Sequence, residues 1–292
     1  MGLMRYNYRS EALSLCVDIT ITYPSGLFTY NNGDDSRLRT GGNSRRPVEK
    51  KLPYKEGMKF QTVYMLHGGS DDDTTMIRNT NLERYAERNC VMTVTAQVKD
   101  SFFMDTQYGY NYFTFVTEEL PAVIRTLFAS SPEREDNFII GMAMGGNAAL
   151  ALAFKRPDLY KAAVDLSGGI GCSIDTDFFI DKLSAPGRLK RLNATFGDPA
   201  LIRDGEYDIG YYARKYADEK EKIPQLFVSV GAEDFVRDTV RKDRDALRKL
   251  GYDIHYEEAE GLGHEWDYWD MYIKKALDEW LPLKRAPIYP EE

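Results

Sequence analysis

The chain has few of the residues that would tie it to a disulfide scaffold, a metal or a nucleic acid. Its 292 residues include only three cysteines, and their positions (16, 90 and 172) fit neither a disulfide framework nor zinc-ligand spacing. The formal net charge of −8 argues against nucleic acid and anionic membrane surfaces as partners. No apolar run reaches the roughly 18 residues of a membrane helix, and the first residues lack the apolar core of a signal peptide. We therefore expect a cytoplasmic protein without a metal site, a nucleic-acid partner or a membrane partner.

Apolar segments of strand length alternate with segments of helical periodicity along most of the chain. An N-terminal strand is predicted within 9–30 and an exposed turn at 31–51. Later strands are predicted at 60–66, 91–96, 162–166, 226–230 and 254–258, and helices at 75–89, 113–128, 239–250 and 268–281. This alternation implies an α/β fold, with a mostly parallel, doubly wound sheet covered on both faces. The polar, tyrosine-rich stretch 171–222 breaks the pattern and is predicted to be a small helical insertion. No linker divides the chain, so residues 1–292 are predicted to form one domain.

The segment 137–150 is predicted to be an apolar strand, a tight turn and the start of a helix. Its turn has the spacing Gly141-x-Ala143-x-Gly145. In a nucleophile elbow, a serine stands at the centre of this pattern, with small residues on both sides because strand and helix crowd together there. The two glycines meet that demand, but the central residue is alanine. The turn therefore has the form of a serine hydrolase elbow without its nucleophile.

Two further residues follow the elbow in the order acid, then histidine, which is the order of an α/β-hydrolase triad. Asp234 is predicted to stand at the end of the strand 226–230, where a carboxylate could orient an imidazole. His264 lies in a glycine-containing loop beyond the next strand, and an imidazole suits the role of general base. Glu233 is a rival for the acid. His255 lies inside a predicted strand and is interpreted as a packed or edge side chain.

The sequence His67-Gly68-Gly69 directly follows a predicted strand. In α/β-hydrolases this position supplies one backbone amide to the oxyanion hole, so the Gly69 amide is predicted to act together with that of Met144. Met144 opens the helix after the elbow, and its position adds the partial positive charge of a helix N-terminus. The acidic run 71–73 is interpreted as a solvated helix N-terminus, because three consecutive carboxylates cannot readily converge on a metal.

Aromatic residues occur in the segments that should converge on the cleft. Tyr108 and Tyr110 lie in a loop without clear periodicity, and Trp266 follows the histidine loop. These three residues, together with His67 and Gly68, are predicted to contact substrate. Trp269 is as consistent with core packing as with a pocket.

The motifs together resemble the esterase D-like serine esterases, a family that includes tributyrin, acetyl and feruloyl esterases and S-formylglutathione hydrolases. The matching segments are Tyr64 to Gly69, Tyr108 to Pro121, Gly141 to Gly146, Gly231 to Asp234 and Gly263 to Trp269. The resemblance implies an α/β-hydrolase fold, short-chain acyl or feruloyl and acetyl ester substrates, and no cofactor. It also implies that position 143 is normally the serine, that Asp234 and His264 complete the triad, and that a homo-oligomer is plausible.

Alanine at position 143 is the departure from the family pattern. Because the elbow glycines, the acid, the histidine and the oxyanion segment are all present, we interpret it as a Ser→Ala substitution that inactivates a carboxylic ester hydrolase. Two other hypotheses stay open. The chain could be a natural pseudoenzyme that binds an ester or glycan, such as an oligosaccharide ester, or it could derive from an acyltransferase that acts on a sugar.

Overall fold

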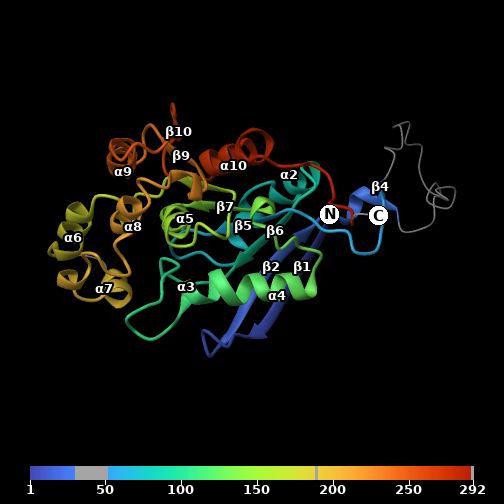
Figure 1. Cartoon of the computed structure of the whole chain (residues 1–292), viewed down its shortest axis with the longest axis horizontal. Helices are drawn as coiled ribbons and strands as arrows, with labels where there is room; N and C mark the ends of the chain where they lie inside the picture. The colour runs from blue at the N-terminus through green and yellow to red at the C-terminus, as the bar shows by residue number, and fades with distance from the viewer. Residues whose placement is uncertain (30–51, 188–189, 291–292) are drawn as a thin grey trace.

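An eight-stranded sheet forms the centre of the computed structural model, which describes residues 1–29, 52–187 and 190–290 (Figure 1). The strand order is β1-β2-β6-β5-β7-β8-β9-β10. The strands from β6 to β10 are parallel, and β2 runs antiparallel to both of its neighbours. Their bounds are β1 Gly2–Arg9, β2 Cys16–Tyr23, β5 Thr62–Leu66, β6 Met92–Ala96, β7 Asn137–Met142, β8 Ala162–Leu166, β9 Gln225–Gly231 and β10 Ile254–Ala259.

The N-terminus is a hairpin, where the sequence predicted one strand within 9–30. Strand β1 pairs along its whole length with β2, and residues 10–15 connect them. Strand β1 was missed because it lies at the sheet edge with mostly exposed residues, so it shows no apolar alternation. The short strands β3 (Phe28–Thr29) and β4 (Leu52–Pro53) pair with each other. The predicted turn at 31–51 lies outside the described residues.

Two predicted helices are interrupted. The helix expected at 75–89 is α1 (Thr75–Asn79) followed by α2 (Leu82–Arg88). Thr80 between them has an extended backbone, and its hydroxyl group donates to the Met76 carbonyl and accepts from the Leu82 amide. The helix expected at 113–128 consists of α3 (Tyr112–Thr114), one wider π turn at 115–119, and α4 (Leu120–Leu127). Pro121 stands in the first turn of α4, where its missing N–H costs little.

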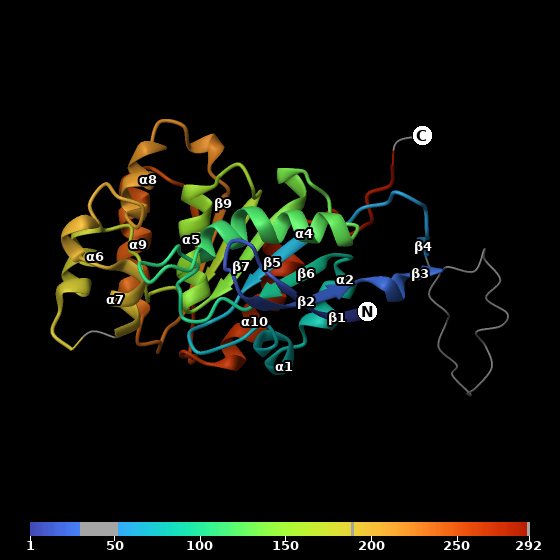
Figure 2. The same cartoon turned by 90° about the horizontal axis from the view of Figure 1, so that it is seen from below.

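Helix α5 (Met144–Lys155) follows β7, α9 (Arg237–Lys249) follows β9, and α10 (Trp266–Lys275) follows β10. The expected insertion is helical, with α6 (Thr176–Ser184), α7 (Lys190–Phe196) and α8 (Ile209–Lys215). These three helices gather at the end of the molecule opposite the N-terminus (Figures 1 and 2). Within the part of the chain that is described, no helix has the length and apolar character needed to cross a bilayer.

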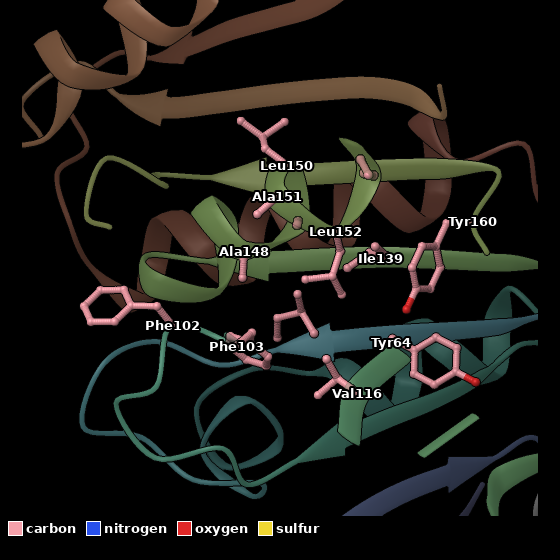
Figure 3. Close-up of a cluster of buried hydrophobic side chains, with 14 of the residues drawn as sticks. Tyr64, Phe102, Phe103, Val116, Ile139, Ala148, Leu150, Ala151, Leu152 and Tyr160 are labelled. Carbon is pink, nitrogen blue, oxygen red and sulfur yellow. The ribbon is translucent and has the colours of Figure 1, made fainter. Parts of the chain in front are cut away.

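Hydrophobic side chains pack on both faces of the sheet. On β7, Ile139 belongs to the core under α4, α5 and α9, whereas its neighbours Phe138 and Ile140 belong to the core under α2 and α10. This alternation follows from the period-2 geometry of a strand. Figure 3 shows part of the first core, in which the rings of Tyr64 and Tyr160 meet edge to face at 6.0 Å. The elbow therefore starts from a strand that is buried on both sides.

Candidate active site

Ala143 occupies a strained turn between β7 and α5. Its backbone angles are φ 50° and ψ −116°. A non-glycine residue in such a region costs on the order of 1–3 kcal/mol and persists only where its surroundings impose it. The Ala143 amide donates to the carbonyl of Leu166 at 2.8 Å, and the Ala143 carbonyl accepts from the amide of Asn147 at 3.2 Å. The sharp turn is thus retained with alanine at its centre.

The glycines of the elbow permit the close contact that this turn requires. A Cβ atom on Gly141 would lie 1.9 Å from the carbonyl oxygen of Gly145, and one on Gly145 would lie 2.0 Å from that of Leu66. Neither position has room for a side chain. Because the surroundings are backbone atoms, no side-chain rearrangement could relieve the clash.

His264 and Asp234 meet at the ends of two neighbouring parallel strands. Asp234 follows β9 and His264 follows β10, and their loops are joined by a hydrogen bond from the Glu233 amide to the Leu262 carbonyl at 3.0 Å. His264 Nδ1 lies 2.9 Å from Asp234 Oδ2. With a proton on Nδ1, the imidazole donates to the carboxylate and leaves Nε2 free to accept a proton. The structure brings the predicted acid and base into contact, and their catalytic roles remain predictions.

The Asp234 side chain is completely buried. Burial by itself raises the pKa of this carboxyl group, but hydrogen bonds from His264 and from the Val236 amide (2.9 Å) outweigh it, and the pKa lies below its ordinary value. Asp234 is therefore an anion at neutral pH. A fixed anion at this place holds the ring and stabilises its protonated form.

His264 and Ala143 line the same cavity, which has a volume of about 330 Å³. Its wall includes the predicted residues Gly68, Gly69, Met144 and Trp266. It also includes Trp269, which the sequence left open between core and pocket, and four residues that were not predicted to contact substrate: Asp71, Phe102, Ile170 and Arg191. The ring of Trp269 packs against His264 with centroids 4.9 Å apart, and that of Trp266 packs against Trp269 at 5.2 Å. The cavity thus has an aromatic side next to the imidazole.

Gly69 and Met144 both line the cavity, and the role of their amides in an oxyanion hole remains a prediction. Within the described ranges, neither amide has a hydrogen-bond partner in the protein. A Cβ atom on Gly68, which precedes Gly69, would lie 3.5 Å from the Cβ of Ala143. The turn at Gly68 and Gly69 therefore lies directly beside the elbow. Two free N–H groups beside position 143 are the arrangement that stabilises a negatively charged oxygen.

Three residues predicted to contact substrate lie outside the cavity wall. The ring of His67 is fully buried, with Nδ1 2.8 Å from the Gly68 carbonyl and Nε2 accepting from the Val98 amide at 3.2 Å. The prediction for its ring is therefore corrected, since the ring holds the turn together and cannot reach a ligand. Tyr108 and Tyr110 are exposed by 46% and 37% and stack edge to face on a surface loop. Neither residue lines the cavity, and their role in substrate binding remains a prediction.

The acidic run 71–73, interpreted as a solvated helix N-terminus, fits that interpretation only at Asp72. Asp71 lines the cavity, and Asp72 accepts hydrogen bonds from Thr74 and Thr75 at the start of α1. Asp73 is fully buried and accepts from Arg5 and Thr20 of the N-terminal hairpin. The three carboxylates point to three different partners. Sequence adjacency could not reveal this, because the hairpin lies far away along the chain.

Comparison with known proteins agrees with this geometry. The family model named Esterase, described as "Putative esterase", matches residues 41–279. An acetyl esterase from Caldicellulosiruptor saccharolyticus is 28% identical over 240 residues, which cover 81% of this chain and 88% of that protein.

Two solved structures from Staphylococcus aureus are similar along nearly the whole chain. The fluorophosphonate-binding serine hydrolase FphF has a TM-score of 0.75 and 26% identity, covering 94% of this chain and 96% of the other. The S-formylglutathione hydrolase FrmB has a TM-score of 0.72 and 26% identity, covering 94% and 97%. The expected α/β-hydrolase fold is confirmed, and the chain belongs to the Esterase family.

Proposed function

We propose that this chain carries the site of a carboxylic ester hydrolase that acts through an acyl-serine intermediate, and that Ala143 leaves it able to bind an ester but not to cleave it. The observation that carries the proposal is the arrangement around position 143. His264, which is paired with Asp234, lines the same cavity as Ala143, Gly69 and Met144. An oxygen on that methyl carbon would complete a triad.

The reaction of the serine form follows from these positions. The serine oxygen attacks the ester carbonyl carbon while its proton passes to His264 Nε2, and Asp234 stabilises the resulting imidazolium. The amides of Gly69 and Met144 donate to the oxyanion. The bond to the alcohol oxygen then breaks, and His264 returns the proton to the leaving alcohol. Water attacks the acyl-serine with His264 again as base, and the carboxylic acid is released.

We further propose that the substrates are short-chain acyl esters such as acetyl esters, or feruloyl esters. A cavity of about 330 Å³ holds a small acyl group, and the side chains of Phe102, Ile170, Trp266 and Trp269 supply apolar surface to its wall. The similarity to an acetyl esterase supports the same class.

The direct test is the variant Ala143→Ser. We expect it to hydrolyse p-nitrophenyl acetate and butyrate at a rate on the order of 10⁴- to 10⁶-fold above the alanine chain, because loss of the nucleophile in a triad has about that effect. The double variant with His264→Ala is the matched control and should lose the gain. Methyl ferulate and acetylated xylan in the same assay would rank the substrates. Turnover no higher than that of the alanine chain would refute the proposal.

Ala143 itself favours a second candidate, in which the natural protein binds esters or glycans without turnover. Calorimetric titration of the unmodified chain with acetylated or feruloylated oligosaccharides tests this candidate. Binding together with an inactive Ala143→Ser variant would support a pure binding protein. If the serine variant is active, a sugar added to its assay separates hydrolysis from transfer, because a transferase would yield acylated sugar instead of free acid.

A further inference from the structure

Asp100 connects the turn that contains Gly69 to the helical insertion. One carboxylate oxygen, Oδ1, accepts the backbone N–H of Ser70 at 2.6 Å. The other, Oδ2, accepts from Nη1 of Arg191 at 2.9 Å. Ser70 directly follows Gly69 in the chain. One oxygen of the Asp100 carboxylate thus binds Ser70, the neighbour of Gly69, and the other binds Arg191 of the helical insertion.

The turn at Ser70 needs an external partner. Ser70 has φ 66°, a left-handed conformation that a serine adopts at some energetic cost. Its N–H faces Asp100 instead of a backbone carbonyl, so the carboxylate is the group that fixes the peptide plane between Gly69 and Ser70. A hydrogen bond to a charged acceptor is about twice as strong as one between neutral groups.

Arg191 lies above the same turn. A Cβ atom on Gly69 would lie 3.5 Å from Asp100 Oδ1 and 3.8 Å from Arg191 Nη2. Besides the ion pair with Asp100, Arg191 Nη1 lies 3.5 Å from the Ser70 hydroxyl oxygen, and the buried Nε has no partner among the described residues. Arg191 belongs to α7, and this helix also packs against the loop that follows Asp100. The ring of Phe196 packs on Phe102 at 5.2 Å.

We propose that Asp100 is a positioning residue for the oxyanion hole and that Arg191 locks it from the insertion. The inference rests on the proposed function, in which the Gly69 amide stabilises the oxyanion. Through Arg191, the helical insertion would then affect the rate of the reaction, although it supplies no residue of the triad. Asp100 acts through the Ser70 peptide and is not part of the cavity wall, whereas Arg191 both holds Asp100 and lines the cavity.

The kinetic test uses the Ala143→Ser background. Asp100→Ala should lower kcat about 10- to 100-fold with little change in KM, because complete loss of one oxyanion donor costs about 10²- to 10³-fold. Asp100→Asn keeps an acceptor for Ser70 and should lose less. Arg191→Met should lower kcat several-fold, and Arg191→Lys should recover part of that loss. Arg203→Met, which removes the exposed ion pair with Asp177 elsewhere in the insertion, is the matched control and should have no effect.

A second measurement uses the alanine chain and does not depend on activity. Hydrogen exchange of the Ser70 amide should accelerate in Asp100→Ala and in Arg191→Met, and it should be unchanged in Arg203→Met. Unchanged exchange in the first two variants would overturn the proposal, as would a kcat equal to that of the parent. If Ala143→Ser shows no turnover, the proposed function fails, and the exchange result still decides whether Asp100 and Arg191 hold the turn.

Discussion

The carboxylate of Asp234 is buried, yet each of its oxygens has a donor. His264 lies at 2.9 Å from one oxygen, and the Val236 amide lies at 2.9 Å from the other. These bonds lower the pKa of Asp234 despite the opposing effect of burial. Because the pKa of Asp234 is lower in the folded than in the unfolded chain, its ionisation stabilises the fold at pH values above the unfolded-state pKa. This stabilisation is lost as the pH falls through the folded-state pKa. The acid therefore stays charged throughout the pH range in which His264 could act as a base.

At the scale of single residues, Asp234→Asn in the Ala143→Ser background should reduce kcat about 10³- to 10⁴-fold, because the amide no longer holds the imidazole in the required tautomer. Glu233→Gln is the matched control. Its side chain was the rival for the acid, and Asp234 holds His264 in the structure, so kcat should stay within about twofold. Steady-state kinetics with p-nitrophenyl acetate measures both variants. A larger loss in Glu233→Gln than in Asp234→Asn would assign the role to Glu233 instead.

Among the elements, the unit formed by β7, the turn and α5 depends on its glycines. Gly145→Ala would place a Cβ atom 2.0 Å from the Leu66 carbonyl oxygen of the neighbouring strand. We expect a loss of about 3–5 kcal/mol of stability or failure to fold, because backbone atoms cannot move aside cheaply. Gly263→Ala is the control, since its nearest contact is at 3.8 Å. Thermal unfolding followed by circular dichroism should separate the two, and equal midpoints would contradict the prediction.

The sequence predicted the elements that determine the site because these carry strong local signals. The strand at 162–166 was predicted with the bounds that the structure has, and the elbow has glycines at two diagnostic positions. Features that depend on distant residues were not predictable. Strand β1 shows no alternation because it lies at an edge, and the contact of Arg191 with Asp100 joins residues 91 positions apart. Likewise, no sequence signal distinguishes a cavity-lining Asp71 from a solvated one.

For the molecule as a whole, the packing of α9 against the sheet brings two buried acids close enough to interact. Asp165 on β8 is fully buried, and burial together with the charge of Asp243 raises its pKa to about 8. Asp243 on α9 accepts hydrogen bonds from Ser173 and the Ile174 amide, and burial raises its pKa as well. Such a pair makes the stability of the whole fold depend on pH.

The sign of this dependence follows from Asp165. Between its ordinary value of 3.8 and about 8, the folded chain keeps a proton that the unfolded chain has lost, so stability falls as the pH rises across this window. Asp165→Asn should therefore raise the melting temperature by an amount that grows from pH 4 to pH 8. Asp245→Asn, on the same helix as Asp243 but exposed, should show no such growth. Differential scanning calorimetry at several pH values measures these melting temperatures. A difference between Asp165→Asn and the parent that stays constant from pH 4 to pH 8 would contradict the prediction.

The conformation of residue 143 is imposed by its neighbours and does not depend on a reactive side chain. The hydrogen bonds to Leu166 and Asn147 and the close backbone packing at Gly141 and Gly145 are all present with alanine. Alanine and serine codons can differ by a single base. Under the proposed function, one exchange between alanine and serine would therefore switch ester hydrolysis on or off without changing the fold around it, because it adds or removes a single oxygen atom on a backbone that already has the required conformation.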